Sequence, residues 1–133
     1  MGLFNRHQSG IRSFLQDAAY WRVAVFLLVT CGLVALLGDE GREVLKYERL
    51  SIEDGEYWRL LTAHFTHLGH THLLLNMAGL VLVWLLVGRN YSSVQWAIVV
   101  SLSMAVISAG FWFVDTHVLW YVGLSGALHG LLI

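Results

Sequence analysis

Charged residues are scarce in this sequence. Only 13% of its 133 residues are Asp, Glu, Lys or Arg, whereas 57% are hydrophobic, and the mean hydropathy is +0.64. Soluble domains carry about 25% charged residues, so the composition excludes an ordinary soluble domain and, by its high hydrophobicity, a disordered chain. The formal net charge of −1 lacks the basic field that a nucleic-acid-binding protein needs.

Proline is absent and cysteine is nearly so. Without proline, no X-Pro kink is available to any helix of the chain. A single cysteine, Cys31, excludes an internal disulfide framework and any cysteine-rich metal site. The cellular compartment therefore has to be inferred from membrane topology.

The few charges leave long gaps between them. No Asp, Glu, Lys or Arg occurs in residues 23–38, 60–88, 90–114 or 116–133. Because about 20 apolar residues cross a membrane as a helix, these gaps predict an all-α polytopic transmembrane helix bundle. The last predicted helix starts near Ser125, nine residues from the end of the sequence, too few to cross. We therefore expect an N-terminal piece of a longer membrane protein; a natural three- or four-helix protein is the alternative.

The signs of the flanking charges predict the orientation. Residues 1–22 carry three arginines against one aspartate, whereas residues 39–58 carry seven acids against three bases. Arg89 and Asp115 continue the alternation. Since basic loops stay in the cytoplasm, we expect a cytoplasmic N-terminal segment (1–19), followed by a membrane domain (20–133) with its acidic loop outside.

Two small-residue patterns predict close helix packing. Ser101, Ala105 and Ala109 recur at every fourth position, and Gly126 and Gly130 form a GxxxG motif. In lipid such faces let backbones approach closely, although simple abundance of small residues also explains the first pattern. Lipid-facing or interfacial positions are expected for Trp84, Trp96, Trp112 and Trp120.

Polar residues gather at two places in these apolar segments. The first cluster consists of His64, His67, His70, His72 and Asn76; the second is the run 123–126 with His129. The predicted topology places both clusters at the same outer membrane face. Polar groups inside spans are functional candidates by default, so we expect the two clusters to form one site.

The residue types at this site suit acyl transfer. His72 and Asn76, at i and i+4, share one helix face and both can donate hydrogen bonds. Ser125 lies between Gly123 and Gly126 at the expected start of a helix, where backbone N–H groups and the helix dipole stabilise negative charge. A serine hydroxyl facing fixed donors is the arrangement that stabilises a tetrahedral oxyanion.

Three stretches resemble the rhomboid family of intramembrane serine proteases: Trp58–Arg59, the HLLLN run 72–76 and the GLSG run 123–126. The surrounding sequence is most similar to the bacterial rhombosortase branch, which is associated with surface proteins that carry a Gly-Gly-containing C-terminal membrane tail. The resemblance implies a six-helix fold, of which about the first four spans are present.

The resemblance also implies roles. Ser125 would be the nucleophile, and the His72 and Asn76 side chains, with the Ser125 backbone N–H, would form the oxyanion hole. Substrate-binding or supporting positions would be Gly123, Gly126, His67 and His129. The substrate would be a membrane-anchored protein, cleaved near the outer face of a bacterial inner membrane without a metal or other cofactor.

The family's general base, a histidine on a later span, has no counterpart in this sequence. We therefore expect this chain alone to be inactive, because nothing activates the serine. His129 could replace the base only by bending back along its own helix, so the expected role of His129 is packing or orientation.

Two alternatives stay open at this point. One is an inactive rhomboid-like fragment. The other is a haem- or metal-binding membrane protein using the histidines above together with His117, which requires three or four of them to converge on a metal, or two to face a haem.

Overall fold

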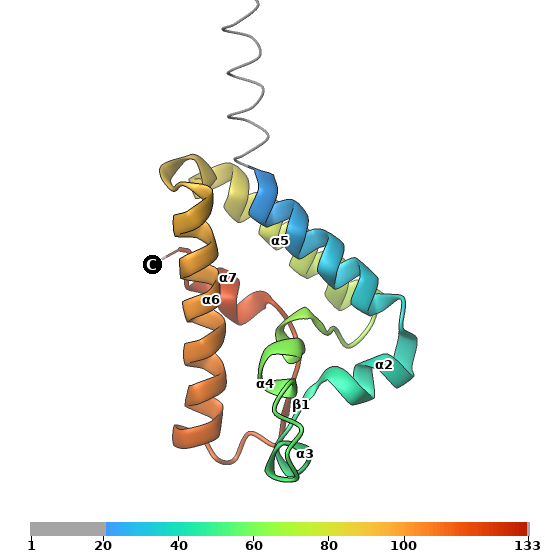
Figure 1. Cartoon of the computed structure of the whole chain (residues 1–133). Helices are drawn as coiled ribbons and strands as arrows, with labels where there is room; N and C mark the ends of the chain where they lie inside the picture. The colour runs from blue at the N-terminus through green and yellow to red at the C-terminus, as the bar shows by residue number, and fades with distance from the viewer. Residues whose placement is uncertain (1–20, 133) are drawn as a thin grey trace, which may run out of the picture.

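The computed structural model describes residues 21–132, which form a helix bundle with one very short β-ladder (Figure 1). The helices and strands are the N-terminal helix (Trp21–Ala35), α2 (Gly38–Leu45), β1 (Tyr47–Glu48), α3 (Arg49–Glu53), α4 (Arg59–Thr62), α5 (His70–Val87), α6 (Ser93–Ala109), β2 (Trp120–Tyr121) and α7 (Ser125–His129). Short turns of other helix types are η1 (Ala63–Phe65), η2 (Gly88–Asn90) and η3 (Gly110–Val114). The all-α membrane bundle predicted from the sequence is confirmed, whereas the expected cytoplasmic segment 1–19 lies outside the described residues.

Two of the described helices are long and apolar enough to cross a membrane. They are His70–Asn90, which joins α5 to η2, and Ser93–Val114, which joins α6 to η3. The N-terminal helix bends by 114° into α2, at Gly38, whose φ of 66° favours glycine. If the N-terminal helix and α2 are counted together as one span, the structure has a third span. Helix α7 covers only Ser125–His129.

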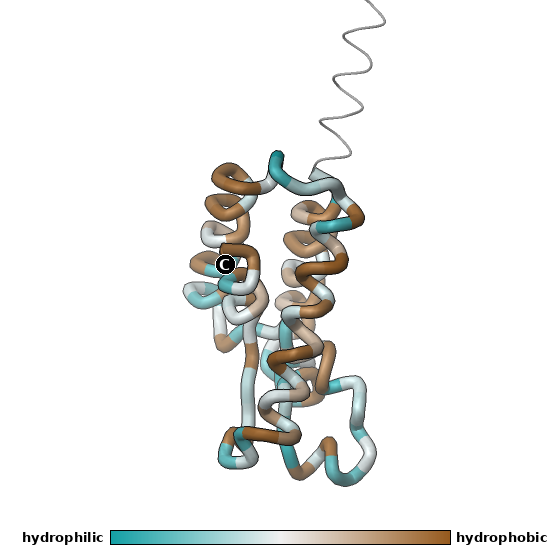
Figure 2. The backbone as a smooth tube through the Cα atoms, turned by 90° about the vertical axis from the view of Figure 1, so that its left-hand side faces the viewer, coloured by the Kyte–Doolittle hydropathy of each residue, from teal (hydrophilic) through white to brown (hydrophobic). Residues whose placement is uncertain are grey.

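The spans and α7 enclose a common apolar core. In Figure 2 hydrophobic residues recur along the helices. Trp84 and Trp96 are buried in this core with stacked rings 4.2 Å apart. The expectation that these two tryptophans face lipid is wrong. The tight η2 turn brings α5 and α6 together at this end, and the Trp96 indole donates a hydrogen bond to the Gly88 carbonyl at 2.9 Å.

Small residues set the position of α7 between α5 and α6. A Cβ on Gly126 would lie 2.8 Å from Ile107 Cδ1, and one on Gly130 would lie 2.3 Å from Ser103 Oγ. On the other side, a Cβ on Gly79 would be 3.7 Å from the Leu128 side chain. The GxxxG glycines are therefore the contact face of α7 toward α6.

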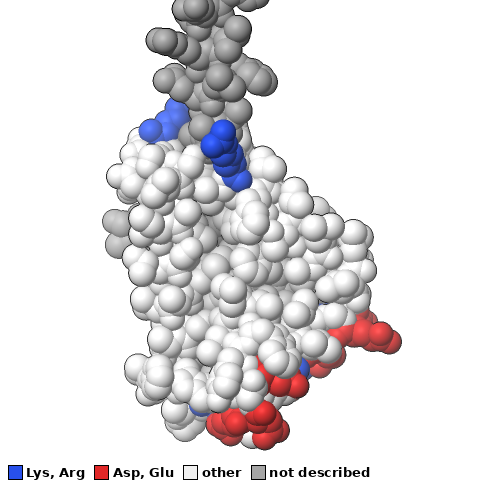
Figure 3. Space-filling view, viewed as in Figure 1, with Lys and Arg blue, Asp and Glu red and all other residues white. Residues whose placement is uncertain are grey.

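The segment 38–69 folds over one end of the bundle, and we call it the loop region. Strand β1 pairs antiparallel with β2, with Tyr47 opposite Tyr121 and Glu48 opposite Trp120. A second small core lies beneath the ladder, around Tyr47, Ile52 and Ala63. In Figure 3 the acidic side chains gather at this end, far from the end where the N-terminal helix begins.

Arg59 fixes the loop region internally. Its guanidinium is buried, and Nη1 donates to the carbonyls of Glu43 and Lys46 at 2.7 and 3.0 Å. Its Nε also donates to the Glu56 carboxylate, and the neighbouring Trp58 indole donates to the Val44 carbonyl at 3.3 Å. The Trp58–Arg59 pair thus satisfies the last carbonyls of α2, as cations near a helix C-terminus do, and ties α2 to α4.

Candidate active site

Ser125 is the first residue of α7 and follows a tightly held turn. The backbone N–H of Gly123 donates to the Ala63 carbonyl at 2.9 Å, and the Tyr121 hydroxyl donates to the Gly123 carbonyl at 2.7 Å. Gly123 has a φ of 117°, a left-handed conformation that a residue with a side chain adopts only with strain. The turn that presents Ser125 is therefore fixed from the loop region and from β2.

The structure brings His72 and Ser125 together across this glycine. A Cβ on Gly123 would lie 3.0 Å from His72 Cε1, 3.2 Å from His72 Nε2 and 3.9 Å from Ser125 Oγ. The imidazole ring and the serine hydroxyl therefore both lie close to Gly123, and the ring lies where a side chain at residue 123 would need room.

Contacts with the loop region orient the His72 ring. The Leu68 backbone N–H donates to His72 Nδ1 at 3.4 Å. A neutral ring that accepts at Nδ1 carries its proton on Nε2, the nitrogen that faces Gly123. The Leu68 carbonyl in turn accepts from Arg42 Nη1 at 3.2 Å, so α2 is linked through Leu68 to His72.

His67 packs edge-on against His72, with ring centroids 5.2 Å apart and planes at 69°. Burial and, to a smaller extent, the proximity of His72 together lower the pKa of His67 from 6.5 to about 4, and the Phe65 backbone only partly opposes them. Neither buried ring nitrogen makes a well-formed hydrogen bond. At neutral pH His67 is thus an uncharged packing partner of His72.

His64 lies deeper and does not reach the serine. It is fully buried, and its Nε2 donates at 2.9 Å to the hydroxyl of Ser108, which itself donates to the Leu60 carbonyl. Burial lowers the pKa of His64 from 6.5 to about 4. These contacts join the loop region to α6, so the structure gives His64 a supporting place away from the cleft.

Asn76 lies one turn after His72 on α5 and is buried. Its Nδ2 donates to the His72 carbonyl at 2.9 Å, while its Oδ1 is buried without a partner. A cleft of about 400 Å³ between α5 and α7 is lined by predicted site residues and by apolar neighbours. The lining residues are His72, Leu75, Asn76, Gly79, Leu82, Val83, Ser125, Leu128, His129 and Leu132.

His129 is exposed on α7, and its Nδ1 lies 2.7 Å from the Ser125 carbonyl oxygen. Since a carbonyl only accepts, Nδ1 must carry the proton there, and the ring is bonded to the backbone of Ser125 instead of its hydroxyl. Among residues 21–132, no histidine is hydrogen-bonded to Ser125 Oγ. A second hollow, of about 540 Å³, lies beyond Ser125 and His129 toward Gly126 and Tyr121.

The remaining histidines do not converge on a metal ion. His70 and His117 are exposed, at the start of α5 and before β2. Within the part of the chain that the structure describes, no three His, Cys, Asp or Glu side chains are placed to hold a metal.

Arg42, Leu68 and Tyr121 are contacts of the site that the sequence did not point to. Arg42 reaches Leu68 from 26 positions away, a separation at which no sequence periodicity carries a signal. Tyr121 stands two residues before Gly123, but its hydroxyl acts through a turn whose shape only the folded chain defines.

The bundle and the cleft define this protein as an integral membrane protein with a serine beside a histidine and an asparagine, and comparison with known proteins names the class. Residues 54–133 match the Rhomboid domain, and the chain belongs to the rhomboid family.

Among curated proteins, the chain is 30% identical over 90 residues to the "Putative rhomboid protease YdcA" of Bacillus subtilis (strain 168). The match covers 68% of this chain but only 45% of that relative, so the chain spans less than half of its length. No solved structure matches the chain significantly.

Proposed function

We propose that this protein is an intramembrane serine protease in which Ser125 attacks the scissile carbonyl. The observation that carries the proposal is that Ser125, His72 and Asn76 line one cleft, with Ser125 Oγ and His72 Nε2 3.9 and 3.2 Å from the position that a Cβ on Gly123 would take. A substrate carbonyl held in this cleft would meet a nucleophile and N–H donors, which is what acyl transfer requires.

Three groups would stabilise the tetrahedral oxyanion. His72 donates from Nε2, because the Leu68 N–H occupies Nδ1. The Asn76 amide has two protons, of which one bonds the His72 carbonyl and the other remains for substrate. The Ser125 backbone N–H at the start of α7 is the third. Loss of one such donor costs about 10²–10³-fold in rate in serine proteases.

The base that takes the serine proton is proposed to come from outside residues 21–132. His129 is bonded to the Ser125 carbonyl and is better placed to orient α7 than to accept the hydroxyl proton. The open cleft between α5 and α7 gives an added group a direct approach to Ser125. Rhomboid resemblance supports a histidine on a later span in this role.

The substrate is proposed to be a membrane-anchored protein, in particular one with a Gly-Gly-containing C-terminal tail, as the similarity to rhombosortases suggests. We place the protein in a bacterial inner membrane with its N-terminus in the cytoplasm. In Figure 3 acidic side chains are seen only at the loop-region end, where basic ones also occur, whereas the opposite end shows basic side chains alone; this asymmetry supports a periplasmic Ser125.

The experiment is activity-based labelling and cleavage in liposomes. Wild type, Ser125→Ala and a control Ser101→Ala on α6 are treated with a fluorophosphonate probe and with a reporter anchored by a Gly-Gly tail. Each protein is tested as the 133-residue chain and with any downstream coding sequence. We expect labelling and cleavage that Ser125→Ala abolishes and Ser101→Ala leaves unchanged.

The outcomes test three parts of the proposal separately: the serine mechanism, the source of the base and the preference for a Gly-Gly tail. Cleavage by Ser125→Ala would refute the serine mechanism. Labelling only with the downstream sequence would support an external base, whereas activity of the 133-residue chain would return the role to His129. Equal cleavage of a reporter with Val-Val in place of Gly-Gly would refute the tail preference alone.

An inactive rhomboid-like protein is the second candidate, favoured by the missing hydrogen bond between Ser125 Oγ and any described histidine. It predicts no labelling in any form of the protein.

A further inference from the structure

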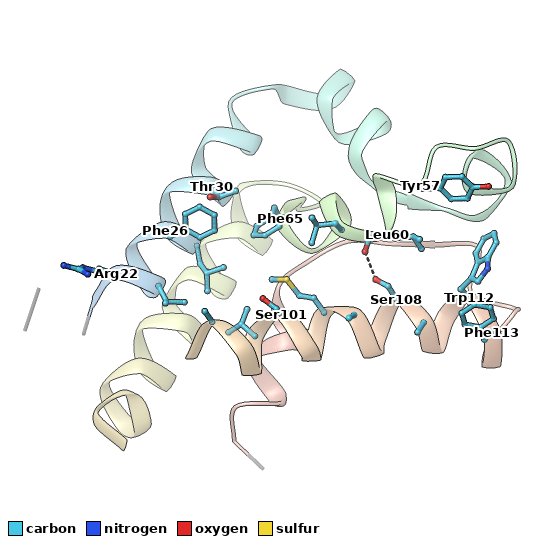
Figure 4. A pocket seen from close by; sticks show the side chains of 18 residues that line it. Arg22, Phe26, Thr30, Tyr57, Leu60, Phe65, Ser101, Ser108, Trp112 and Phe113 are labelled. Carbon is cyan, nitrogen blue, oxygen red and sulfur yellow. Dashed lines mark hydrogen bonds between the residues drawn. The ribbon is translucent and has the colours of Figure 1, made fainter. Parts of the chain in front are cut away.

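A hollow larger than either of the two at Ser125 lies away from the serine. It has a volume of about 930 Å³ and runs between the N-terminal helix, the α4–η1 segment and α6 (Figure 4). It shares no lining residue with the two hollows at Ser125. We call it the α6 groove.

The α6 groove is apolar and open along its side. Phe26, Leu61 and Phe113 border it while remaining 62%, 57% and 77% exposed. The residues Ala97, Ser101, Ala105 and Ala109 line it along α6. The sequence had predicted that part of this small-residue row packs against a helix; it lines the groove instead, because α7 packs on another face of α6, around Ser103 and Ile107. In a bilayer the open side faces hydrocarbon.

The two ends of the groove differ in chemistry. Arg22 is the charged residue among the described lining residues, and Figure 4 shows it beyond the apolar stretch at one end. Tyr57 and Trp112 lie at the other end, where Arg49 sits 5.0 Å over the Trp112 ring. An arginine at the end of a span extends to the interface, where lipid phosphates are found, and Tyr and Trp mark the opposite interface.

We propose that the α6 groove binds one anionic phospholipid of the bilayer, with its phosphate at Arg22 and an acyl chain along α6. The lined stretch of α6 and η3 runs from Ala97 to Phe113, about 24 Å at 1.5 Å per residue, which suits an acyl chain within a hydrocarbon core of about 30 Å. The complementary charge selects an anionic headgroup.

Charge also argues against a second copy of the chain as the occupant. Copies in one membrane share an orientation, so a symmetric pair would place two Arg22 side chains at the same depth. The described residues of the lining include no carboxylate to compensate them, whereas a phospholipid brings its own negative charge. The bound lipid would lie between the N-terminal helix and α6, beside their shared core.

The test measures lipid retention by native mass spectrometry on the purified 133-residue chain. The probes are phosphatidylglycerol and phosphatidylcholine with identical acyl chains. We expect one retained phosphatidylglycerol, preferred over phosphatidylcholine. Arg22→Gln should lower that preference about fivefold, the effect of about one basic charge near a membrane surface, while Arg89→Gln, a basic residue outside the groove, should not change it.

A second pair of variants locates the lipid. Ser101→Trp fills the groove from an exposed position and should abolish retention, whereas Leu102→Trp, also exposed but outside the lining, should not. A phospholipid with a photoreactive acyl chain should label α6 and the N-terminal helix. The proposal would be overturned if Ser101→Trp retained as much lipid as wild type, or if Arg22→Gln kept the wild-type preference for phosphatidylglycerol. It would also be overturned if the chain formed a dimer without bound lipid and Ser101→Trp disrupted that dimer.

Discussion

The loop region and the two long spans are held in place in different ways. In the loop region, side chains of Arg59, Thr62 and Arg42 donate hydrogen bonds to backbone carbonyls of other segments. The spans α5 and α6 instead expose rows of large apolar side chains, among them Leu74, Leu75, Leu82, Leu85, Val94, Ile98, Leu102 and Val106. Such rows are stable only where lipid replaces water as the solvent.

This difference indicates which region determines the geometry of the site. The loop region contacts both halves of the cleft, through Leu68 on His72 and through the Ala63 carbonyl on Gly123. The spans supply the depth in the membrane and the backbone that carries Asn76. Directed polar contacts fix angles, whereas apolar packing mainly fixes proximity. Changes in the loop region or its two contacts should therefore affect catalysis more than changes on the spans.

Among changes at the contacts between the loop region and the cleft, Gly123→Ala is expected to lower kcat/KM the most. The new methyl group would meet the His72 ring at 3.0 Å and strain a backbone at φ 117° by about 1–3 kcal/mol. Because it displaces a proposed oxyanion donor as well, kcat/KM should fall about 10³-fold. Gly69→Ala is the control, since nothing lies within 4 Å of a Cβ there. A kcat/KM that stays near wild type would show that the position of the His72 ring beside residue 123 is not important for catalysis.

Asn76→Ala should reduce the rate by up to about 10²–10³-fold, less than Gly123→Ala because only one proposed donor is lost. The His72 carbonyl that Asn76 contacts lies within α5, so helicity measured by far-ultraviolet circular dichroism should be unchanged. A rise in KM alone, with kcat intact, would contradict an oxyanion role. Such a result would leave Asn76 as a packing residue of the span.

Acidification should disrupt the loop region before the spans. Burial holds the pKa values of His64 and His67 at about 4, against 6.5 for the exposed side chain. Between these values the unfolded state binds more protons, so stability is fully present above pH 6.5 and is lost as the pH falls toward 4. Tryptophan fluorescence should change over this window while helical circular dichroism persists. Loss of both signals together would show that the two regions unfold as one unit.

The smallest effect is expected from Arg42→Gln, which weakens a partly exposed contact with the Leu68 carbonyl. A hydrogen bond of this kind contributes about 0.5–1.5 kcal/mol, so kcat should fall about 2–10-fold through a less well-oriented His72. Arg42→Lys should restore part of the rate, and Arg89→Gln at the other end of the bundle should have no effect. Equal losses in Arg42→Gln and Arg89→Gln would point to general destabilisation.

Much of the fold followed from the sequence because it depends on local composition. Charge-free segments predicted the spans, and the start of a helix at Ser125 agrees with the glycine-flanked serine. The sequence placed Trp84 and Trp96 wrongly, since composition alone does not distinguish a lipid-facing ring from one buried between two helices. It also did not anticipate the β1–β2 ladder, whose two strands are far apart in the chain.

The candidate site, like the fold, could be predicted from the sequence only in part. Its residue types, Ser125, His72 and Asn76, could be selected from motif and spacing, and their catalytic roles remain predictions. The orientation of the His72 ring, the bond of His129 to the Ser125 carbonyl and the close approach of His72 to Gly123 could not be predicted in this way. Each depends on contacts between separate segments, which no local pattern encodes.

By itself, the sequence determined that this chain lies in a membrane and belongs to the rhomboid family, because hydrophobicity and short motifs are properties of contiguous residues. The tertiary structure decided which histidine faces the serine, which small-residue face receives α7 and which one lines a groove open to lipid. The physical reason is that hydrogen bonds and close packing act over a few ångströms in space, and only the folded chain brings residues such as His72 and Gly123 within that range.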